Sequence, residues 1–442
     1  MQSELRIFPR EGGEIQRVHL VRPDDWSALD FLTPTPTADA FHCFHKIYHQ
    51  FLVPSAPHLF GKLVLFTLPE GVSLPASWAR KFAGRVDDPL TAAAMMLRRD
   101  VKIGGEQVTF RSREAQALWQ ELERRGCLAV VRGEKSHTQI IPIGSRAGYL
   151  TESEGEMKVN SSFFVMDPID CATPYDHVGT PFGLMVKDGE VASPPLFSRE
   201  ALVVRQDGTV SVEYPDLRRL AVCVGGRVFI HGRNAVFYTR PKHCRIPFGR
   251  KGLVIIGRRV AAVCRGGEEI PTSGFVLCPK GRCSVRVGES VSYAGMEDVA
   301  FALQVGNSIV RDGVKTEEFR SPFYDLRDGN STPFPPSMYP LDYKGARAAR
   351  VALGADSEGK PMILWAEGSA KLGHTPGTDS CGASLSEMAE MCAELGMVNG
   401  INLDGGGSAQ ILLKDRRSLW ISDRSPDFSE AQRPVPMGLV VR

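Results

Sequence analysis

Several hallmarks of common protein classes are missing from this sequence of 442 residues. No apolar run reaches the roughly 18 residues that a membrane-spanning helix needs. Lys and Arg number 53 and Asp and Glu 51, so the net charge is +2 and composition gives no signal of a nucleic-acid or other polyanionic partner. We therefore expect neither a membrane nor a nucleic acid among the partners.

The cysteines also lack a pattern, and so does the start of the chain. Ten cysteines are scattered without a Cys-x-x-Cys pair, which is typical of reduced thiols rather than of a disulfide framework. Residues 1–20 are charged and lack the apolar core of a signal peptide. These absences predict a cytoplasmic protein, or a secreted one if a leader has been removed. We predict no cofactor or metal, and the sequence does not indicate an oligomeric state.

The length predicts two domains, each able to bury a core. Residues 1–145 are predicted to form a small α/β accessory domain of unknown role, and residues 146–442 a second domain. The elements expected in the first are a strand, a helix and two further strands, at residues 63–68, 113–125, 127–131 and 138–143. The helix would present one apolar face, made by Ala115, Leu118, Trp119 and Leu122.

Three histidines in the first part have helical spacing. His42, His45 and His49 would share one helix face, and three imidazoles could bind zinc. No carboxylate or cysteine is spaced to complete such a site. The pattern therefore favours a half-buried polar face over a metal site.

The most informative stretch runs from Asn402 to Ser408. A capping box, Ser384 with Glu387, predicts a helix start, and two apolar segments, residues 398–403 and 409–413, predict strands around Asp404-Gly-Gly-Gly. Consecutive glycine amides can bind an anion beside the acid. The alternative is a tight hairpin capped by Asp404, and spacing alone does not decide between the two.

Residues 396–413, together with Glu387-Met388-Ala389, resemble the signature of the phosphodiester glycosidase family. The resemblance covers about residues 156–442 and is strongest over residues 346–442. It implies an α+β fold with a mixed β-sheet core and flanking helices. It also implies a hydrolase that cleaves the glycosidic bond of a sugar-1-phosphodiester, or a related glycan, and releases the sugar.

The resemblance also implies roles for individual residues. Asp404 and Glu367 would be the catalytic carboxylate pair, although relatives carry Asp where Glu367 stands. The substrate-binding residues would be Arg350, Asn160, Gly405, Gly406, Gly407 and Ser408. Arg350 would clamp the phosphate, its structural alternative being a surface ion pair. Asn160 would bind a sugar or phosphate oxygen, or simply form a turn.

Two other functions stay open, one because of a departure from the family and one because of the limits of a resemblance. Ser161 and Ser162 stand where relatives carry two glycines, which leaves a non-catalytic glycan-binding protein possible on the same fold. An exo-glycosidase acting on a phosphate-free glycan is the other alternative, since a fold never fixes the substrate. The Pro-rich residues 325–343 predict a long loop that could act as a lid.

Overall fold

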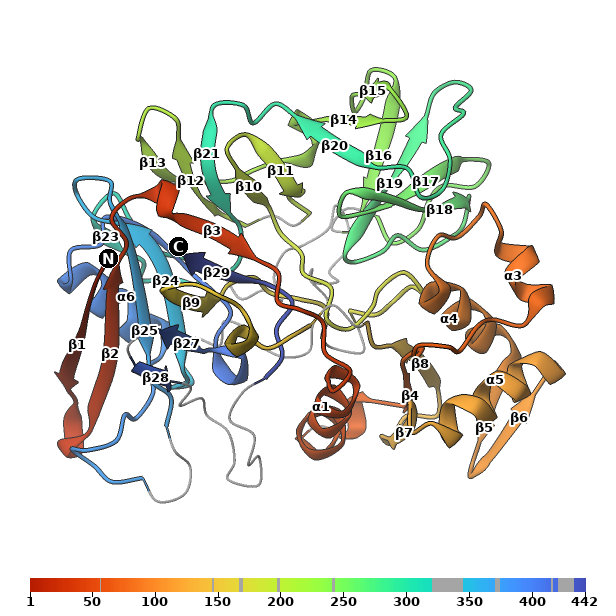
Figure 1. The fold of residues 1–442 in the computed structure, drawn as a ribbon, viewed down its shortest axis with the longest axis horizontal. Coiled ribbons are helices and arrows are strands. Elements are labelled where there is room, and N and C mark those ends of the chain that lie inside the picture. The colour runs from red at the N-terminus through yellow and green to blue at the C-terminus, as the bar shows by residue number, and fades with distance from the viewer. Residues whose placement is uncertain are drawn as a thin grey trace.

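The computed structural model describes residues 1–442 except 56, 145–146, 167–169, 197–198, 241–242, 320–344, 370–373, 415 and 420–432. The predicted lid at residues 325–343 lies outside the described residues. Strands far outnumber helices, and the predicted α+β class is confirmed (Figure 1). Within the described parts, no helix has the length and apolar character to cross a membrane.

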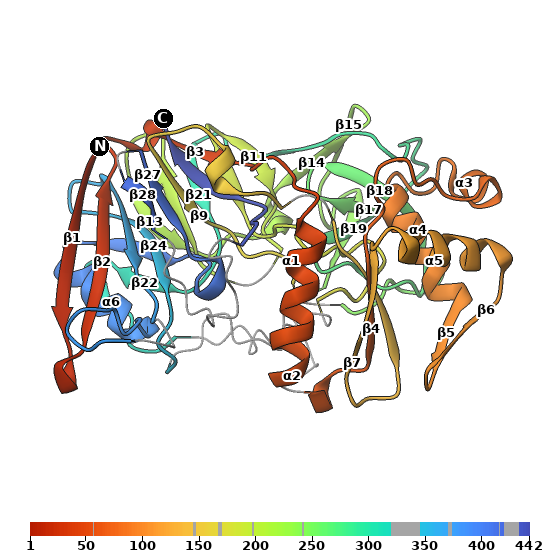
Figure 2. The same cartoon turned by 60° about the horizontal axis from the view of Figure 1, so that its bottom comes forward.

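A seven-stranded antiparallel sheet forms the left side of the molecule in Figures 1 and 2. One face packs on the other sheets in the largest hydrophobic core, and the other face is covered by α6 (Leu385–Glu394). Its strands, in spatial order, are β1 (Gln2–Pro9), β2 (Ile15–Arg22), β25 (Pro361–Ala366), β24 (Arg350–Ala355), β26 (Asn399–Asn402), β22 (Ser308–Arg311) and β23 (Val314–Lys315).

Two five-stranded antiparallel sheets share the main core with this sheet. The first consists of β28 (Arg416–Leu419), β27 (Ile411–Leu413), β9 (Met157–Asn160), β29 (Gly438–Val441) and β3 (Leu29–Leu32). The second consists of β11 (Glu190–Ser193), β10 (Met185–Lys187), β21 (Val299–Leu303), β12 (Ala201–Arg205) and β13 (Val210–Glu213). Strands β26 and β27 lie in different sheets, so the hairpin alternative for the glycine stretch was wrong. The loop between them crosses from one layer to the next.

Two smaller sheets lie at the upper right of Figure 1. One consists of β15 (Arg227–Phe229), β14 (Ala221–Val224) and β20 (Val291–Ala294). The other consists of β16 (Ala235–Thr239), β19 (Gly274–Pro279), β17 (Lys251–Ile256) and β18 (Arg259–Arg265).

A small α/β unit occupies the right end of Figures 1 and 2, with its own core. Its helices are α3 (Ala76–Phe82), α4 (Pro89–Asp100) and α5 (Arg113–Arg124). Its strands are β7 (Leu128–Arg132), β4 (Lys62–Phe66), β8 (Thr138–Pro142), β5 (Val101–Gly104) and β6 (Gln107–Phe110). Strands β7, β4 and β8 form a three-stranded sheet, and β5 and β6 form a hairpin. The three-stranded sheet is mixed, because β4 pairs with β7 in antiparallel and with β8 in parallel orientation. The predicted apolar face of α5 is confirmed, because its four residues are buried.

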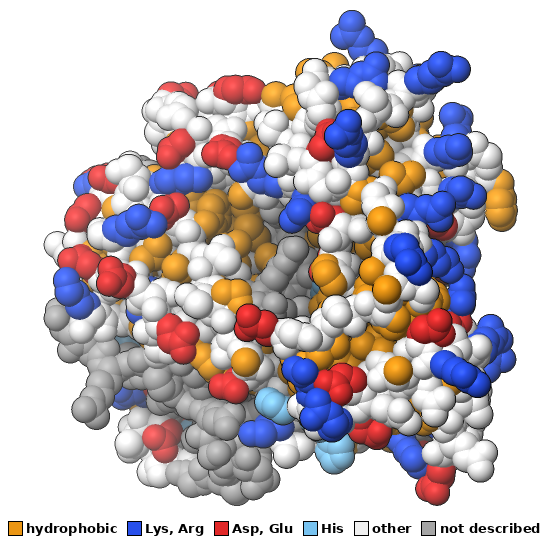
Figure 3. Space-filling model, turned by 45° about the vertical axis from the view of Figure 1, so that its right-hand side comes forward, with side chains coloured by type: hydrophobic (Ala, Val, Ile, Leu, Met, Phe, Trp, Pro, Cys, Tyr) orange, Lys and Arg blue, Asp and Glu red, His pale blue; other side chains and the backbone are white. Residues whose placement is uncertain are grey.

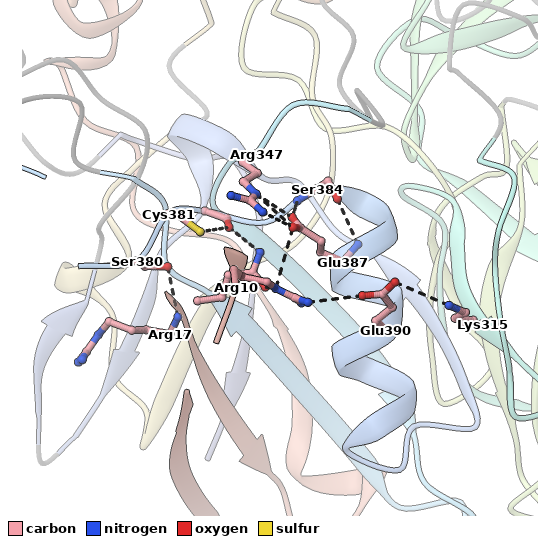
Figure 4. A network of polar contacts seen from close by, with 11 residues as sticks. Arg10, Arg17, Lys315, Arg347, Ser380, Cys381, Ser384, Glu387 and Glu390 are labelled. Carbon is pink, nitrogen blue, oxygen red and sulfur yellow. Dashed lines mark hydrogen bonds and ion pairs between the residues drawn. The ribbon is translucent and has the colours of Figure 1, made fainter. Parts of the chain in front are cut away.

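The first strands of the chain do not belong to that unit. Strand β2 pairs with β25, and β3 pairs with β29, so residues 2–32 extend the sheets of the second part. Figure 4 shows polar contacts along the same junction: Arg10 approaches Glu387 and Glu390 of α6, and Glu390 also pairs with Lys315. The domain division at residue 145 stays a prediction. The strand pairing nevertheless places the first 32 residues with the second predicted domain, residues 146–442.

The three histidines lie on α1 (Ala40–Ile47) and the turn after it. His42 and His49 are exposed, His45 is half-buried, and the rings of His45 and His49 are 6.0 Å apart. Burial, followed by the two neighbouring imidazoles, lowers the pKa of His45. The described residues contain no cluster of three potential ligands placed to hold a metal.

Candidate functional site at the end of the seven-stranded sheet

Three predicted site residues lie on segments that reach the same end of the seven-stranded sheet. Asp404 follows β26, Arg350 begins β24, and Glu367 follows β25. Arg350 lies opposite Ala366, and the Leu403 amide donates to the Val351 carbonyl at 2.8 Å. Because neighbouring strands lie about 4.8 Å apart, this register gathers the three segments at one edge.

The helix before the site forms as its sequence predicts. The Ser384 side chain accepts from the Glu387 amide at 3.1 Å, and the Glu387 carboxylate accepts from the Ser384 amide at 2.8 Å. Arg347 also donates to Glu387, as Figure 4 shows. Burial alone would raise the pKa of Glu387, but the bonds from Arg347 and the Ser384 amide lower it below its usual range. The helix ends before Gly396, whose φ of +91° favours glycine.

The three glycines are explained by close packing. A Cβ on Gly405 would lie 2.9 Å from the Ala349 carbonyl oxygen, and one on Gly407 would overlap the Arg433 guanidinium. Gly406 has a φ of +56°, and its amide donates to the same Ala349 oxygen at 2.8 Å. That amide is engaged within the protein, so in this conformation the loop does not present three neighbouring amides to an anion.

Asn160 is fully buried and holds the loop in place. Its side-chain nitrogen donates to the Asp404 carbonyl at 2.6 Å, and its side-chain oxygen accepts from the Gln410 amide at 2.9 Å. The Asp404 amide in turn donates to the Ser161 carbonyl at 3.0 Å. Asn160 is therefore neither a simple turn residue nor a side chain with an open amide. It positions Asp404, whose residue is 7% exposed.

Arg350 is 3% exposed, so the surface ion pair considered for it was wrong. Its Nε donates to the Ala383 carbonyl at 3.1 Å and one terminal nitrogen to the Ala346 carbonyl at 3.0 Å. These bonds tie the start of β24 to the segment before α6. A phosphate would have to compete with them.

Glu367 has two partners that the sequence analysis missed. Arg17 Nε donates to one carboxylate oxygen at 3.0 Å, and His19 Nε2 lies 2.6 Å from the other. His19 and Glu367 are both nearly fully buried. The two partners come from β2, outside the region of family resemblance. The sequence signal that could have found them is the alternation of Arg17 and His19 with Val18 and Leu20. Such a period-two pattern predicts a strand with one polar face.

Strand alternation also separates two of the predicted residues. The Glu367 amide donates to the Arg17 carbonyl at 2.9 Å, so the ladder continues past β25. Glu367 shares a face with Trp365, which belongs to the main core. Arg350 lies opposite Ala366, which belongs to the core under α6. Glu367 and Arg350 therefore lie on opposite faces of the sheet edge.

Three serines lie on the segments around Asp404: Ser161 and Ser162 after β9, and Ser408 after the glycines. Ser161 and Ser162 are buried, and neither hydroxyl has a hydrogen-bond partner within the described part of the chain. The Ser408 hydroxyl accepts from Arg433 at 3.1 Å. Arg433 was not predicted as a site residue, and it explains both the glycine at 407 and the position of Ser408.

The sequence matches the phosphodiester glycosidase family over residues 153–442, and the chain is a member of that family. Among named relatives, it is similar to mouse N-acetylglucosamine-1-phosphodiester alpha-N-acetylglucosaminidase, with 29% identity over 193 residues, which is 38% of this chain and 35% of the mouse protein. The human enzyme is 38% identical over 80 residues, covering 18% of this chain and 14% of the human one. The matches thus span about a third and a seventh of those relatives.

Solved structures were also compared with the chain. The zebrafish enzyme of the same name, described as a catalytic domain auto-inhibited by pro-peptide, aligns with a TM-score of 0.36 and 12% identity. That alignment covers all of this chain and 82% of the zebrafish chain. A hypothetical protein from Synechocystis gives a TM-score of 0.41 at 15% identity, covering 99% of this chain and 61% of the other.

Proposed function

We propose that the protein is a hydrolase that cleaves the glycosidic bond of a sugar-1-phosphodiester and releases the sugar. Family membership supports the reaction class. The observation that carries the proposal is the placement of Asp404: a nearly buried carboxylate at a strand end, its backbone fixed on both sides by Asn160 and Ser161. Fixed geometry of this kind is what a reacting carboxylate requires. The names of the relatives suggest N-acetylglucosamine as the sugar.

The reaction is a displacement at the anomeric carbon. The bond from that carbon to the bridging oxygen breaks, and its electron pair leaves with the phosphomonoester. A water oxygen bonds to the carbon, and one water proton passes to a carboxylate or to the leaving phosphate. A phosphate departs with little protonation, so the main task is to stabilise the oxocarbenium charge. We assign that role, or activation of the water, to Asp404.

The other residues support this arrangement. Asn160 holds the backbone at Asp404, and Arg350 fixes the start of the neighbouring strand β24. Glu367 is proposed as the second carboxylate. Arg17 and His19 hold its carboxylate in place, one contact to each oxygen. The predicted cytoplasmic location remains a prediction.

A non-catalytic glycan-binding protein is the second candidate. It is favoured by Glu367, because both of its carboxylate oxygens already have protein partners. A carboxylate engaged in this way is less available to activate water. In that case Asp404 would bind a sugar hydroxyl instead.

One substrate panel separates these functions. The protein would be incubated with the methyl phosphodiester of N-acetylglucosamine 1-phosphate and with an aryl glycoside of the same sugar. We expect sugar release from the phosphodiester, lost in Asp404→Asn. Faster cleavage of the aryl glycoside would favour an exo-glycosidase. Calorimetric binding without turnover would favour the glycan-binding protein.

A further inference from the structure

Charge is distributed very unevenly along this chain. Residues 217–290, here called the basic lobe, contain fifteen Lys and Arg but three Asp and Glu, a net charge of +12. Because the whole chain carries +2, the remainder carries −10. The lobe comprises β14 to β19. In Figure 3, Lys and Arg gather over the upper right of the face shown, where acidic side chains are few.

Most of these cations have no carboxylate partner. Four arginines of the lobe form ion pairs, with Asp216, Glu269, Glu190 and Asp87. Nine other exposed cations lie in no ion pair with a described carboxylate: Arg219, Arg227, Arg233, Arg250, Lys251, Arg265, Lys280, Arg282 and Arg286. Unpaired like charges repel one another and do not stabilise a fold.

The unpaired cations form clusters on neighbouring elements. Arg227 donates to the Arg282 carbonyl at 2.7 Å. The Lys280 amide donates to the Asn234 carbonyl at 2.9 Å, and its ammonium group donates to the carbonyl of Gly232, next to Arg233. These contacts place Arg227 of β15 and Arg233 of the turn after it beside Lys280 and Arg282, which follow β19.

A second cluster lies at the end of one hairpin. Lys251 of β17 is directly opposite Arg265 of β18, and Arg250 precedes Lys251. Like charges directly opposite each other in a ladder are destabilising. The fold gains nothing from this pair, whereas a polyanion would bridge it.

The surface chemistry favours one kind of polyanion. Single-stranded nucleic acids need successive aromatic platforms, but Phe248 is the one exposed aromatic side chain among the described residues of the lobe. Anchoring to a bilayer needs gathered apolar side chains. The large exposed ones here lie apart in the chain: Val228 on β15, Phe248 in the connection between β16 and β17, and Val263 on β18. Arginine is the dominant cation, and its planar donors suit phosphate groups.

We infer that the basic lobe binds a glycan that carries repeated phosphodiester groups, and holds it while one linkage reacts at the sheet edge. This inference rests on the proposed function for the identity of the substrate. A substrate with a single phosphodiester would gain nothing from the lobe. A polymer would be attracted through several phosphates at once, and its binding would weaken steeply with salt.

Binding is tested in the Asp404→Asn background, so that no probe is consumed. The probe is a synthetic oligomer of sugar 1-phosphodiester units, titrated between about 50 and 200 mM salt. Arg227, Arg233, Lys280 and Arg282 are changed together to Gln. We expect affinity at low salt to fall about tenfold or more, and the log–log salt slope to become shallower by about three. The kcat and KM for a small phosphodiester should not change.

A control variant removes the same charge elsewhere, by changing the exposed residues Arg6, Arg113, Arg124 and Lys360 to Gln. It should bind the oligomer within about twofold of the parent, since screened distant charges contribute little. An equal loss in both variants would overturn the inference, as would an absence of oligomer binding. So would tighter binding of a single-stranded oligonucleotide, or phosphatidylserine-vesicle binding that Phe248→Ser abolishes. Lobe-dependent binding without hydrolysis of the small phosphodiester would instead overturn the proposed function alone.

Discussion

The sheet-edge site and the basic lobe handle charge in opposite ways. At the sheet edge, Arg350, Glu367 and Asn160 are buried, and their polar atoms contact backbone or side chains of the protein. On the lobe, nine cations are exposed without a described carboxylate partner. From this difference we infer that charged residues paired inside the fold mainly fix its geometry, whereas exposed cations without a carboxylate partner face a partner in solution. Variants that remove buried charged residues or exposed ones test this distinction.

Removal of residues 1–32 should have the largest effect. Without β2, the edge of β25 is exposed and Glu367 loses both Arg17 and His19, which leaves a buried carboxylate unpaired. An uncompensated buried charge is strongly destabilising. We expect no soluble folded protein, measured by yield and circular dichroism. A soluble, active protein that starts at residue 33, or at residue 146, would show that the first strands are dispensable.

Asp404→Asn should reduce turnover at least about 100-fold and leave the fold intact. Asparagine has nearly the same size as aspartate, and the backbone bonds from Asn160 and to Ser161 are kept, so the melting temperature should stay near that of the parent. Turnover is measured on the small phosphodiester. Near-normal activity in the folded variant would reduce Asp404 to a structural residue.

His19→Leu should lower turnover about tenfold, because it removes the hydrogen bond that orients Glu367. His19→Gln keeps a donor near the same position and should recover most of the activity. This rescue separates positioning from general loss of stability. Equal losses in the two variants would argue against a role for the hydrogen bond.

Arg350→Lys should reduce kcat/KM for phosphodiester and for phosphate-free substrates to the same extent, by a few-fold. It should also lower the melting temperature by several degrees. The reason is that the Arg350 guanidinium bridges the Ala383 and Ala346 carbonyls, and a lysine cannot reach both with the same geometry. A selective loss on phosphodiesters would instead restore the phosphate-clamp role predicted from the sequence.

Glu387→Gln should have the smallest effect, about 2 °C in melting temperature at pH 7. The pKa of Glu387 is lower in the folded state, so its contribution is present above the unfolded value of about 4.3 and is lost as the pH falls below it. The difference between variant and parent should therefore shrink progressively as the pH falls below about 4.3 and through the lower folded-state pKa. Glu390→Gln, whose side chain is more exposed, is the control and should change less. A difference that stays constant as the pH is lowered through the acid range would contradict the ionic explanation.

Features that depend on neighbouring residues could be predicted from the sequence, whereas contacts between distant segments could not. The capping box of Ser384, the end of the helix at Gly396 and the place of Asp404 after a strand depend on neighbouring residues, and all are confirmed. The pairing of β2 with β25 joins residues more than 300 positions apart, which no local pattern encodes. For that reason Arg17 and His19 were missed. The basic lobe was missed because a net charge of +2 averages two regions of opposite sign.

The packing around the glycines also could not be predicted from the sequence. Three glycines indicated an open anion-binding loop, but the structure shows that they admit the Ala349 carbonyl and the Arg433 guanidinium. Only the arrangement of two layers reveals which backbone or side chain approaches a glycine. The burial of Ser161 and Ser162 was equally hidden, and their hydroxyls lack hydrogen-bond partners within the described part of the chain.

The most direct test of the central claim is the position of bond cleavage. The small sugar-1-phosphodiester is hydrolysed in water enriched in oxygen-18, and the phosphomonoester is analysed by mass spectrometry. A glycosidase breaks the bond between the anomeric carbon and oxygen, so the account predicts a phosphomonoester without label and a labelled sugar. The phosphate product is decisive, because the anomeric hydroxyl of a free sugar exchanges with water. Label in the phosphomonoester would mean cleavage at phosphorus and would contradict the assignment.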